Sequence, residues 1–405
     1  MMYETIRFGD LYAVDSRNGL TKPSKIRGSG YKMINMGELF ANDRIYDIPM
    51  ELVPLKENEK FSAKVEVGDL LFARQSLVLE GAGKCSIVMD VSSLTVFESH
   101  LIRVRLISNA NPMFYYYYFR SPISPIKTIV SQCAQAGIRG SDLQELSVIF
   151  PSKEQQDKIA NILSKYDDLI ENNKKQIKLL EEAAQRLYKE WFVDLRFPGH
   201  EDVAIVDGIL EGWTEKNMED ICDSIGGGTP STKIEGYYKD GKIRWVTPTD
   251  ITRNNSLILL DTDKKITEEG LNNSSAKMVP PYTILMTSRA SVGFFGLCEH
   301  EVCTNQGFIS CVPYQENVRF YLLYNLMNRV DEIRAKASGS TFLEISKKTF
   351  RELRIILPSE CVLNEFTQHI HPMIRQMEVL TKSIDKLSEA RDRLLSRLMN
   401  GKIEV

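Results

Sequence analysis

Residues 145–152 read ELSVIFPS, and residues 352–359 read ELRIILPS. The two stretches lie 207 positions apart, and the same offset continues behind them, where residues 175–187 align with residues 382–394. Seven positions of this second pair carry the same residue type. An ungapped match that crosses from strand-like into helix-like sequence is not readily explained by chance, so it predicts an internal duplication.

The duplication extends toward the N-terminus of each copy, with small insertions. Pro23-Ser24 corresponds to Pro230-Ser231, residues 34–39 to residues 246–251, and residues 70–76 to residues 285–291. Each copy begins with short apolar runs broken by Gly, Pro and Asn, which are typical of strands with frequent turns. A long helical segment then follows. We therefore predict an α+β fold in which two duplicated α/β domains (1–150 and 199–357) are each followed by a helix (151–198 and 358–405), with pseudo-two-fold symmetry.

The two helices have recognisable ends. No Gly or Pro occurs between Ser152 and Leu195, and Ser152 with Gln155 forms a capping-box pattern. Pro198-Gly199 ends this helix. The second helix is expected from about Ser359 to Asn400-Gly401, a plausible left-handed stop, and Pro372 should kink it or mark a break.

Apolar residues recur every seven positions in both helices, which indicates a coiled-coil seam. In the first helix the two rows are Ile159, Tyr166, Asn173, Leu180, Leu187 and Leu163, Ile170, Ile177, Ala184, Trp191. The offset of 207 gives Phe366, Met373, Leu380, Leu387, Leu394 and Ile370, Met377, Ile384, Arg391, Leu398. A helix of about 41 residues spans roughly 60 Å, more than the width of one domain. The two helices are therefore expected to form an antiparallel coiled coil, in which Asn173 either fixes the alignment or lies exposed at the edge.

Composition excludes several classes of protein. The 405 residues are 43% hydrophobic and 26% charged, which is typical of globular rather than disordered chains. There is no apolar run long enough for a membrane span and no secretory signal pattern. The seven cysteines form no Cys-x-x-Cys pair, which disfavours zinc and a disulfide framework and favours the reduced cytoplasm. The net charge of −3 gives no hint of nucleic acid.

Several stretches resemble catalytic motifs but fail in detail. Asn111-Pro112-Met113-Phe114 is one residue from the Asn-Pro-Pro-Phe loop of amino-methyltransferases, and no Gly-rich cofactor loop follows a strand upstream of it. Residues 226–230 and 81–84 lack the spacing of a phosphate-binding loop and are interpreted as turns. The aromatic run at residues 115–118 could stack on bases, but a core role is favoured.

Donor side chains recur on loops at equivalent places in both copies. Arg, Lys, Asn and Gln read base edges, whereas Ser, Thr and Lys hold phosphates. Any single one of these residues could be merely solvated, but the duplicated set favours DNA contact. The candidates in the first copy are Lys22, Lys25, Arg27, Arg74, Ser76 and Arg139. Those in the second copy are Thr229, Ser231, Lys233, Arg244, Trp245, Arg289, Ser291, Asn305, Gln306, Ser340 and Thr341, with Lys347 and Lys348 as further donors nearby.

These residues resemble a known family. GGTPS at 227–231 and GKIRWV at 241–246 are similar to the opening of a target-recognition domain of Type I restriction–modification specificity subunits. ILMTSRASVG at 284–293 and TNQGF at 304–308 resemble its later motifs, and residues 179–192 resemble its central spacer helix. The first copy departs from the pattern, with Lys22-Pro23-Ser24 for Thr-Pro-Ser and His100-Leu101 for Asn-Gln.

The resemblance implies a non-catalytic reader of double-stranded DNA. Each recognition domain would read one half of a bipartite asymmetric site, and the helices would set the gap. Two methyltransferase subunits would bring S-adenosylmethionine, and restriction/translocase subunits would bring ATP and Mg, with no cofactor bound by this chain. Two alternatives remain: a stand-alone DNA adenine methyltransferase that uses the loop at Asn111, and a coiled-coil scaffold without DNA contact.

Overall fold

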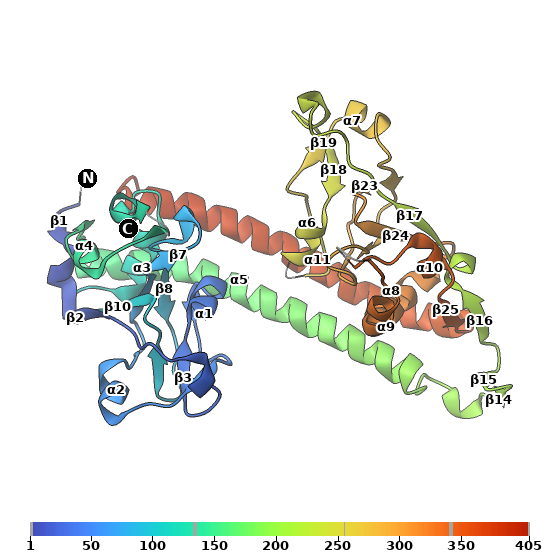
Figure 1. The fold of residues 1–405 in the computed structure, drawn as a ribbon, viewed down its shortest axis with the longest axis horizontal. Helices are drawn as coiled ribbons and strands as arrows, with labels where there is room; N and C mark the ends of the chain where they lie inside the picture. The colour runs from blue at the N-terminus through green and yellow to red at the C-terminus, as the bar shows by residue number, and fades with distance from the viewer. Residues whose placement is uncertain (1–2, 133–135, 255, 340–342, 404–405) are drawn as a thin grey trace. The chain divides into compact units, whose positions relative to one another are not determined.

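The computed structural model describes residues 3–132, 136–254, 256–339 and 343–403. The chain divides into two compact units (Figure 1): unit 1 is Met1–Leu169 with Leu387–Val405, and unit 2 is Ile170–Lys386. Each unit therefore holds one α/β body and a part of both long helices. Within the described residues, no helix has the length and apolar character needed to cross a membrane.

Unit 1 is built on a five-stranded sheet of order β2-β10-β6-β8-β4 and a three-stranded sheet of order β5-β3-β9. Two small sheets, β11-β12-β7 and β1-β13, complete it. The strands are β1 (Thr5–Arg7), β2 (Tyr12–Asn18), β3 (Tyr31–Ile34), β4 (Arg44–Ile45), β5 (Glu51–Val53), β6 (Leu70–Ala73), β7 (Gln75–Ser76), β8 (Cys85–Val88), β9 (Thr95–Phe97), β10 (Leu101–Leu106), β11 (Ser131–Gln132), β12 (Ala136–Gly137) and β13 (Ser147–Ile149). The short helices are α1 (Met36–Ala41), α2 (Glu57–Ser62), α3 (Pro112–Arg120) and α4 (Gly140–Gln144).

Unit 2 has the same plan, with sheets of order β17-β24-β21-β22 and β19-β18-β23-β20 and the pairs β16-β25 and β14-β15. The strands are β14 (Ile205–Val206), β15 (Ile209–Leu210), β16 (Thr214–Asn217), β17 (Cys222–Gly226), β18 (Ile243–Val246), β19 (Lys265–Ile266), β20 (Met278–Val279), β21 (Ile284–Thr287), β22 (Phe295–Gly296), β23 (Val302–Thr304), β24 (Phe308–Pro313) and β25 (Arg354–Leu357). The short helices are α6 (Pro248–Thr252), α7 (Glu268–Asn272), α8 (Arg319–Asn328), α9 (Val330–Ala335) and α10 (Lys347–Arg351).

The two units repeat each other in detail, which confirms the predicted duplication. In unit 1, β1 pairs with β13, and the amide of Phe8 donates to the carbonyl of Leu146 at 2.8 Å. In unit 2, β16 pairs with β25, and the amide of Met218 donates to the carbonyl of Leu353 at the same 2.8 Å. Each unit also contains a matching parallel pair, β3 with β9 and β18 with β23.

The long helices are α5 (Lys153–Tyr188), which continues into a π-helical turn at Lys189–Val193, and α11 (Glu360–Met399). The predicted cap of α5 is confirmed, because the amide of Ser152 donates to Gln155 Oε1 at 3.2 Å and the amide of Gln155 donates to Ser152 Oγ at 3.3 Å. Gly401 has φ +64°, the predicted left-handed stop. The break considered at Pro372 does not occur, since the helix continues through it. Pro372 is exposed, so water can bond the carbonyl that its missing N–H leaves free.

Contacts within each unit show that the helices run antiparallel, as predicted. Residue numbers increase along α5, while the numbers of the contacting residues on α11 decrease. Arg391 bonds Asp167 in unit 1. In unit 2, Asn173 bonds Ser383, and further along the Trp191 and Phe366 rings lie 5.7 Å apart. The predicted inner row of α5 is buried throughout: Leu163, Ile170, Ile177, Ala184 and Trp191 are each at most 5% exposed.

Two polar contacts interrupt this apolar seam. Asn173, only 9% exposed, donates from Nδ2 to Ser383 Oγ at 3.1 Å, so the alternative of an exposed edge position is wrong. Arg391 occupies an apolar position of the heptad and donates to Asp167 Oδ1 at 2.5 Å. The hydroxyl of Tyr117 donates to the other oxygen of the same carboxylate at 2.6 Å. A shifted register would leave these groups unpaired in the interior, so they fix the alignment of the helices.

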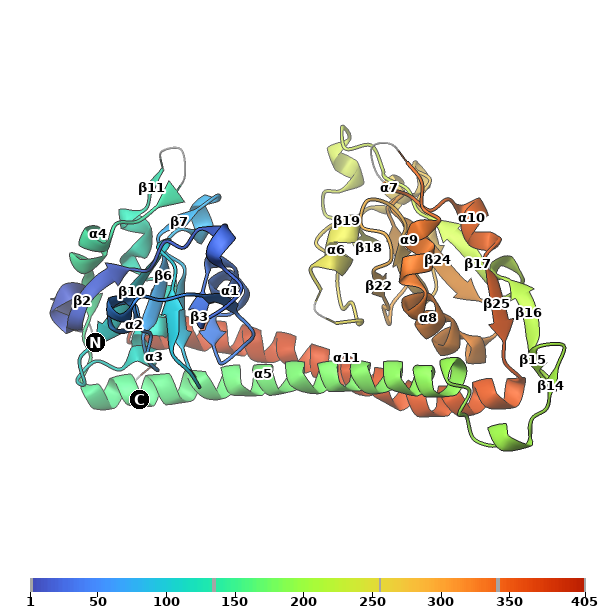
Figure 2. The same cartoon turned by 60° about the horizontal axis from the view of Figure 1, so that its bottom comes forward.

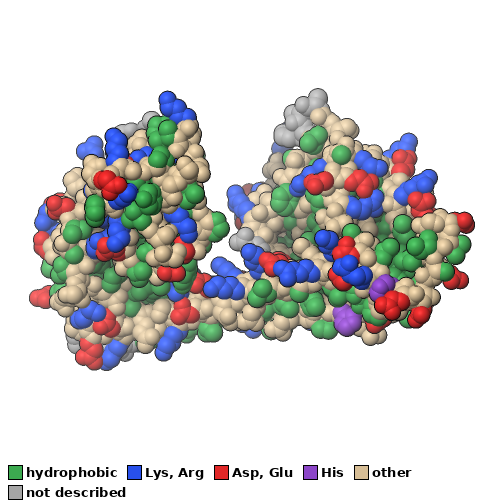
Figure 3. Space-filling view, turned by 90° about the horizontal axis from the view of Figure 1, so that it is seen from below, with side chains coloured by type: hydrophobic (Ala, Val, Ile, Leu, Met, Phe, Trp, Pro, Cys, Tyr) green, Lys and Arg blue, Asp and Glu red, His purple; other side chains and the backbone are tan. Residues whose placement is uncertain are grey.

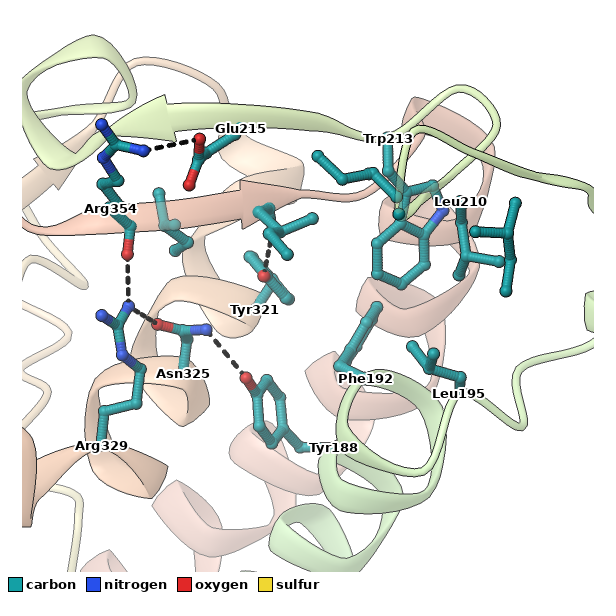
Figure 4. A pocket seen from close by; sticks show the side chains of 15 residues that line it. Tyr188, Phe192, Leu195, Leu210, Trp213, Glu215, Tyr321, Asn325, Arg329 and Arg354 are labelled. Carbon is teal, nitrogen blue, oxygen red and sulfur yellow. Dashed lines mark hydrogen bonds and ion pairs between the residues drawn. The ribbon is translucent and has the colours of Figure 1, made fainter.

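The C-terminal part of α5 packs into unit 2 through its aromatic side chains (Figure 4). Tyr188 accepts a hydrogen bond from Asn325 Nδ2 at 2.9 Å, and burial raises its pKa to about 12. Arg329 bonds Asn325 and the carbonyl of Arg354, whose side chain pairs with Glu215 at 3.0 Å. A hollow of about 400 Å³ remains between these groups and Trp213. The helix is thus locked to strands β16 and β25 of the same unit.

The Asp167–Arg391 pair can be tested by Asp167→Asn. We expect a loss of about 2 kcal/mol in the free energy of unfolding, because an amide accepts from Tyr117 but leaves the half-buried Arg391 without its main counter-charge. Urea denaturation measures the loss. Asp392→Asn is the matched control, since Asp392 contacts the same guanidinium at 2.9 Å but is 63% exposed. Equal losses in the two variants would contradict a special role for Asp167.

Candidate nucleic-acid interface

The two glycines that follow β17 in the chain allow it to lie close to two other loops of unit 2. A Cβ atom on Gly227 would lie 2.1 Å from the carbonyl oxygen of Thr304, and one on Gly228 would lie 2.3 Å from Ser275 Oγ. The amide of Gly228 donates to the carbonyl of Thr304 at 2.9 Å. The next residue, Thr229, bonds Gln306 side chain to side chain. The glycine run is therefore not the predicted turn: Gly226 ends β17 and Gly227 and Gly228 continue as irregular chain, which brings two of the candidate contact residues together.

Two other candidates support these loops from within. Trp245 is 5% exposed, and its indole N–H donates to the carbonyl of Gly228 at 2.9 Å. Asn305 is half-buried, and its Oδ1 accepts from the amide of Gly307 at 2.9 Å. Thr229 and Gln306, in contrast, are exposed. Trp245 and Asn305 thus hold the loops in place, while their neighbours face outward.

Each candidate arginine of unit 2 is held beside a carboxylate. Arg244 Nε lies 3.0 Å from Asp261 Oδ1. Burial acts to raise the pKa of Asp261, but hydrogen bonds, led by that from Lys265, outweigh it and keep this pKa below its usual range. Arg289 Nε lies 3.6 Å from Glu344 Oε2, and both side chains are 45% exposed. The guanidinium of Arg244 is therefore oriented by a hydrogen bond before any ligand arrives, and both guanidinium groups remain accessible at the surface.

The turn that presents Arg289 is tight. Its neighbour Ala290 has φ +61°, and the amide of Ser291 donates to the carbonyl of Arg289 at 2.8 Å. Ser291 itself is partly buried, whereas Ser231 and Lys233 are exposed on the loop that follows β17. The predicted contacts Ser340 and Thr341 lie outside the described residues.

The candidates of unit 1 fall into two separate groups. Lys22 is 8% exposed and forms an ion pair with Glu59 at 2.7 Å. Arg27 donates to the carbonyl of Lys22 at 2.8 Å and pairs with Glu51 at 2.6 Å, whereas Lys25 is exposed. The ammonium of Lys22 is thus used inside the fold, and Lys25 is the accessible cation of this group.

The second group lies at the small sheet β11-β12-β7 of unit 1, of which Figure 2 labels β7 and β11. The amide of Ile138 donates to the carbonyl of Arg74 at 2.9 Å, which brings Arg139, next in the chain, close to Arg74. Arg139 is exposed, and neither arginine has an ion-pair partner among the described residues. Ser76 accepts from the amide of Val78 at 3.2 Å. The structure therefore brings Arg74, Ser76 and Arg139 to one small sheet, whereas Lys22 and Arg27 are bonded to each other and to Glu59 and Glu51.

The loop that resembles a methyltransferase motif is a helix cap. Asn111 Oδ1 accepts from the amides of Met113 and Phe114, and its Nδ2 donates to Asp157 at 2.6 Å. Both ends of the side-chain amide are therefore occupied. The aromatic run that follows lies in α3 and is at most 3% exposed at residues 115–118, so its predicted core role is confirmed.

A polar hollow of about 480 Å³ joins several of the unit 2 loops. Gln306 lines it, as does Glu344, the partner of Arg289. It also contains Lys277, Lys347 and Arg351, of which the sequence analysis singled out only Lys347. Lys277 and Arg351 belong to no motif, and only the fold brings them to these loops. On the face drawn in Figure 3, basic and acidic side chains are interspersed on each unit.

Comparison with known proteins agrees with this architecture. The sequence profile for the Type I restriction modification DNA specificity domain matches residues 2–182 and again residues 210–384. The MjaIX specificity subunit of Methanocaldococcus jannaschii is 33% identical over 183 residues, which span 43% of this chain and 42% of that relative. The HindI specificity subunit of Haemophilus influenzae is 27% identical over 64% of this chain and 70% of its own length.

The fold also has a solved counterpart. The S subunit of a Type I restriction–modification system from M. genitalium superimposes with a TM-score of 0.59 at 16% identity, covering 98% of this chain and 96% of that one. The profile matches each half of the chain separately, and together the two matches take in most of it. The family resemblance inferred from the recognition motifs and the spacer helix is thus confirmed. This chain belongs to the Type I restriction modification DNA specificity family.

Proposed function

We propose that this chain is the DNA-reading subunit of a Type I restriction–modification complex and that each half reads one part of a bipartite, asymmetric site. The recognition domains would be residues 1–150 and 199–357, joined by the spacer helices at 151–198 and 358–405. The observation that carries this proposal is the duplication itself. Two copies of one loop-bearing fold are attached to a single antiparallel helix pair, and the two copies present different side chains.

The helices act as a ruler in this proposal. The 36 residues of α5 run without a break and correspond to about 54 Å of helix. Buried polar contacts fix the register against α11, so the pair cannot slide to a second alignment without leaving Asn173 unpaired. Such a spacer would appear in the DNA site as a gap of unspecified bases between the two specific parts.

The candidate contacts divide by chemistry. Arg244, Arg289 and Gln306 carry groups that can read purine edges, and all three are accessible. The hydroxyl and lysine groups suit phosphates. On this basis the proposed DNA contacts of unit 1 are Lys25, Arg27, Arg74, Ser76 and Arg139, and those of unit 2 are Thr229, Ser231, Lys233, Arg244, Arg289, Ser291 and Gln306, while Lys22, Trp245 and Asn305 position the loops.

The chemistry of the complex would reside on its other subunits. Specificity subunits are the non-catalytic components of these enzymes. Two methyltransferase subunits would supply S-adenosylmethionine, and restriction/translocase subunits would supply ATP and Mg. The cysteines that the structure describes are all free, five of them buried, which supports a reducing compartment such as the cytoplasm.

The rival proposal, a stand-alone methyltransferase, has a direct test. We expect the purified chain to transfer no labelled methyl group from S-adenosylmethionine to DNA, because Asn111 is engaged in capping α3. The same chain reconstituted with its methyltransferase partner should do so. Transfer by the isolated chain, abolished by Asn111→Ala, would contradict the proposed function.

Base reading by unit 2 can be tested by Arg289→Ala and Arg244→Ala. Each is expected to weaken or relax recognition of one half-site only, by about 1–3 kcal/mol if the guanidinium bonds a guanine in bidentate fashion. Binding of the reconstituted complex to DNA with substitutions in either half-site measures this. Arg393→Ala, which removes an exposed arginine paired within α11, is the control. Equal weakening on every sequence would mean that the two arginines hold phosphates instead.

The ruler can be tested by inserting one heptad into each helix, after Leu169 in α5 and after Lys386 in α11. A whole heptad keeps the seam facing its partner and lengthens each helix by about 10.5 Å, or about three base pairs of duplex. The methylated motif in cells that express the variant with its partner should keep both half-sites and gain a longer gap. An active variant with the original gap would contradict the proposal that the length of the helices sets the gap in the DNA site. A heptad in α5 alone should destabilise the subunit.

A further inference from the structure

The polar hollow of unit 2 is lined partly by motif residues such as Gln306, but its cations Lys277, Lys347 and Arg351 belong to none of the family motifs. Its floor is the end of β17, and α10 and the loops at residues 275–277, 304–307 and 344–346 form its walls. Gln306 and Glu344 lie on its lining, and Glu344 is the carboxylate that holds Arg289. A ligand in the hollow would therefore touch the same loops as the DNA bases read by Arg289.

The cationic side chains of the hollow differ in whether another side chain of the protein already binds them. Lys277 and Lys347 are exposed and have no ion-pair partner in the part of the chain that the structure describes. Arg351 is partly buried, and its Nε donates to Ser224 Oγ at 2.7 Å. Of the acidic groups, Glu344 is offset by Arg289, and Asp223 is exposed at the strand. The hollow thus offers two free ammonium groups in a setting of net positive charge.

Local geometry places the ammonium of Lys347 at the end of β17, which lines the hollow. A Cβ atom on Gly226 would lie 3.2 Å from Lys347 Nζ, so the glycine at the end of β17 lets the ammonium lie close over the backbone. The helix that carries Lys347 is fixed by Ser346, whose Oγ accepts from the amide of Thr349 at 3.1 Å. The lysine therefore projects from an anchored helix rather than from a free loop.

Two of these cations, Lys347 and Arg351, are specific to unit 2. By the offset of 207, α10 corresponds to α4 of unit 1, where Gly140 replaces Lys347 and Gln144 replaces Arg351. The pairs β1–β13 and β16–β25 and the two parallel strand pairs recur between the units, but the charges on α10 do not recur on α4. A feature that the shared fold does not require is best explained by a ligand of unit 2.

We propose that the hollow holds a backbone phosphate of duplex DNA, with Lys277 and Lys347 as its cationic contacts and Arg351 as a positioning residue that acts through Ser224. This inference rests on the proposed function. Lysine ammonium groups suit phosphate as compact point charges, whereas the planar guanidinium of the nearby Arg289 suits bidentate recognition. Phosphate contacts fix the register of a protein on the duplex without reading sequence. The two lysines would thereby strengthen the binding of unit 2 to any DNA sequence, while Arg289 and Gln306 meet the base edges.

Salt dependence tests the assignment, with the specificity subunit reconstituted with its methyltransferase partner. Each phosphate contact contributes about 0.9 to the slope of log affinity against log salt. Lys347→Gln and Lys277→Gln should each reduce that slope by about 0.9, and the double variant by about 1.8, equally on cognate and mutated half-sites. The methylated motif should stay the same, and Lys347→Arg should restore the slope.

Lys336→Gln is the matched control, because Lys336 is an exposed lysine of the same unit already paired with Glu332 at 3.5 Å. Its slope should equal that of the unmodified complex. An unchanged slope in the double variant would overturn the phosphate assignment, and so would an altered base motif or a loss of assembly with the methyltransferase. Arg289→Ala distinguishes a failure of the hollow proposal from a failure of the proposed function. If Arg289→Ala relaxes one half-site while the lysine variants change nothing, the hollow proposal fails and the proposed function stands.

Discussion

The buried seam between α5 and α11 is the constraint on which the rest of the structure depends. Each helix carries an apolar row too long for one α/β body to cover, so each must pack along the other. Apolar rows alone would tolerate a slip by a heptad. The Asn173–Ser383 and Asp167–Arg391 contacts do not, because a slip would bury their polar groups without partners. The register of α5 against α11, and with it the spacing that the helix pair sets, therefore depends on these two polar contacts rather than on the more numerous apolar residues of the seam.

Both α/β bodies attach to this helix pair in related ways, but the loops they present differ. In unit 2 the close approach at Gly227 and Gly228 joins two loops into one surface, supported from beneath by Trp245. In unit 1 the corresponding cations are split, with Lys22 drawn into an ion pair inside the fold and Arg74 beside Arg139 elsewhere. A conserved scaffold with divergent loops allows one architecture to recognise two unrelated sequences.

Much of the architecture could be predicted because it follows from local sequence and repetition. The Ser152–Gln155 cap, the stop at Gly401 and the burial of the tyrosine run each depend on a pattern within a few turns of chain. The duplication is visible as an ungapped match of the sequence with itself at an offset of 207 residues. Pro372 was harder, since a proline ends a helix or not according to whether water or protein faces the unpaired carbonyl. The burial of Lys22 and Trp245 could not be predicted for a similar reason, because the exposed fraction of a side chain depends on packing and not on residue type alone.

By itself, the sequence determined that this chain is a duplicated α+β protein with two long antiparallel helices and donor-rich loops. It could do so because heptad spacing, capping and repetition can all be recognised in the amino-acid sequence alone. Only the tertiary structure decided which donors are free. Ion pairs such as Arg289–Glu344 and the meeting of Lys277 with Lys347 join residues that are distant in the chain, and nothing in their local sequence records that they are neighbours.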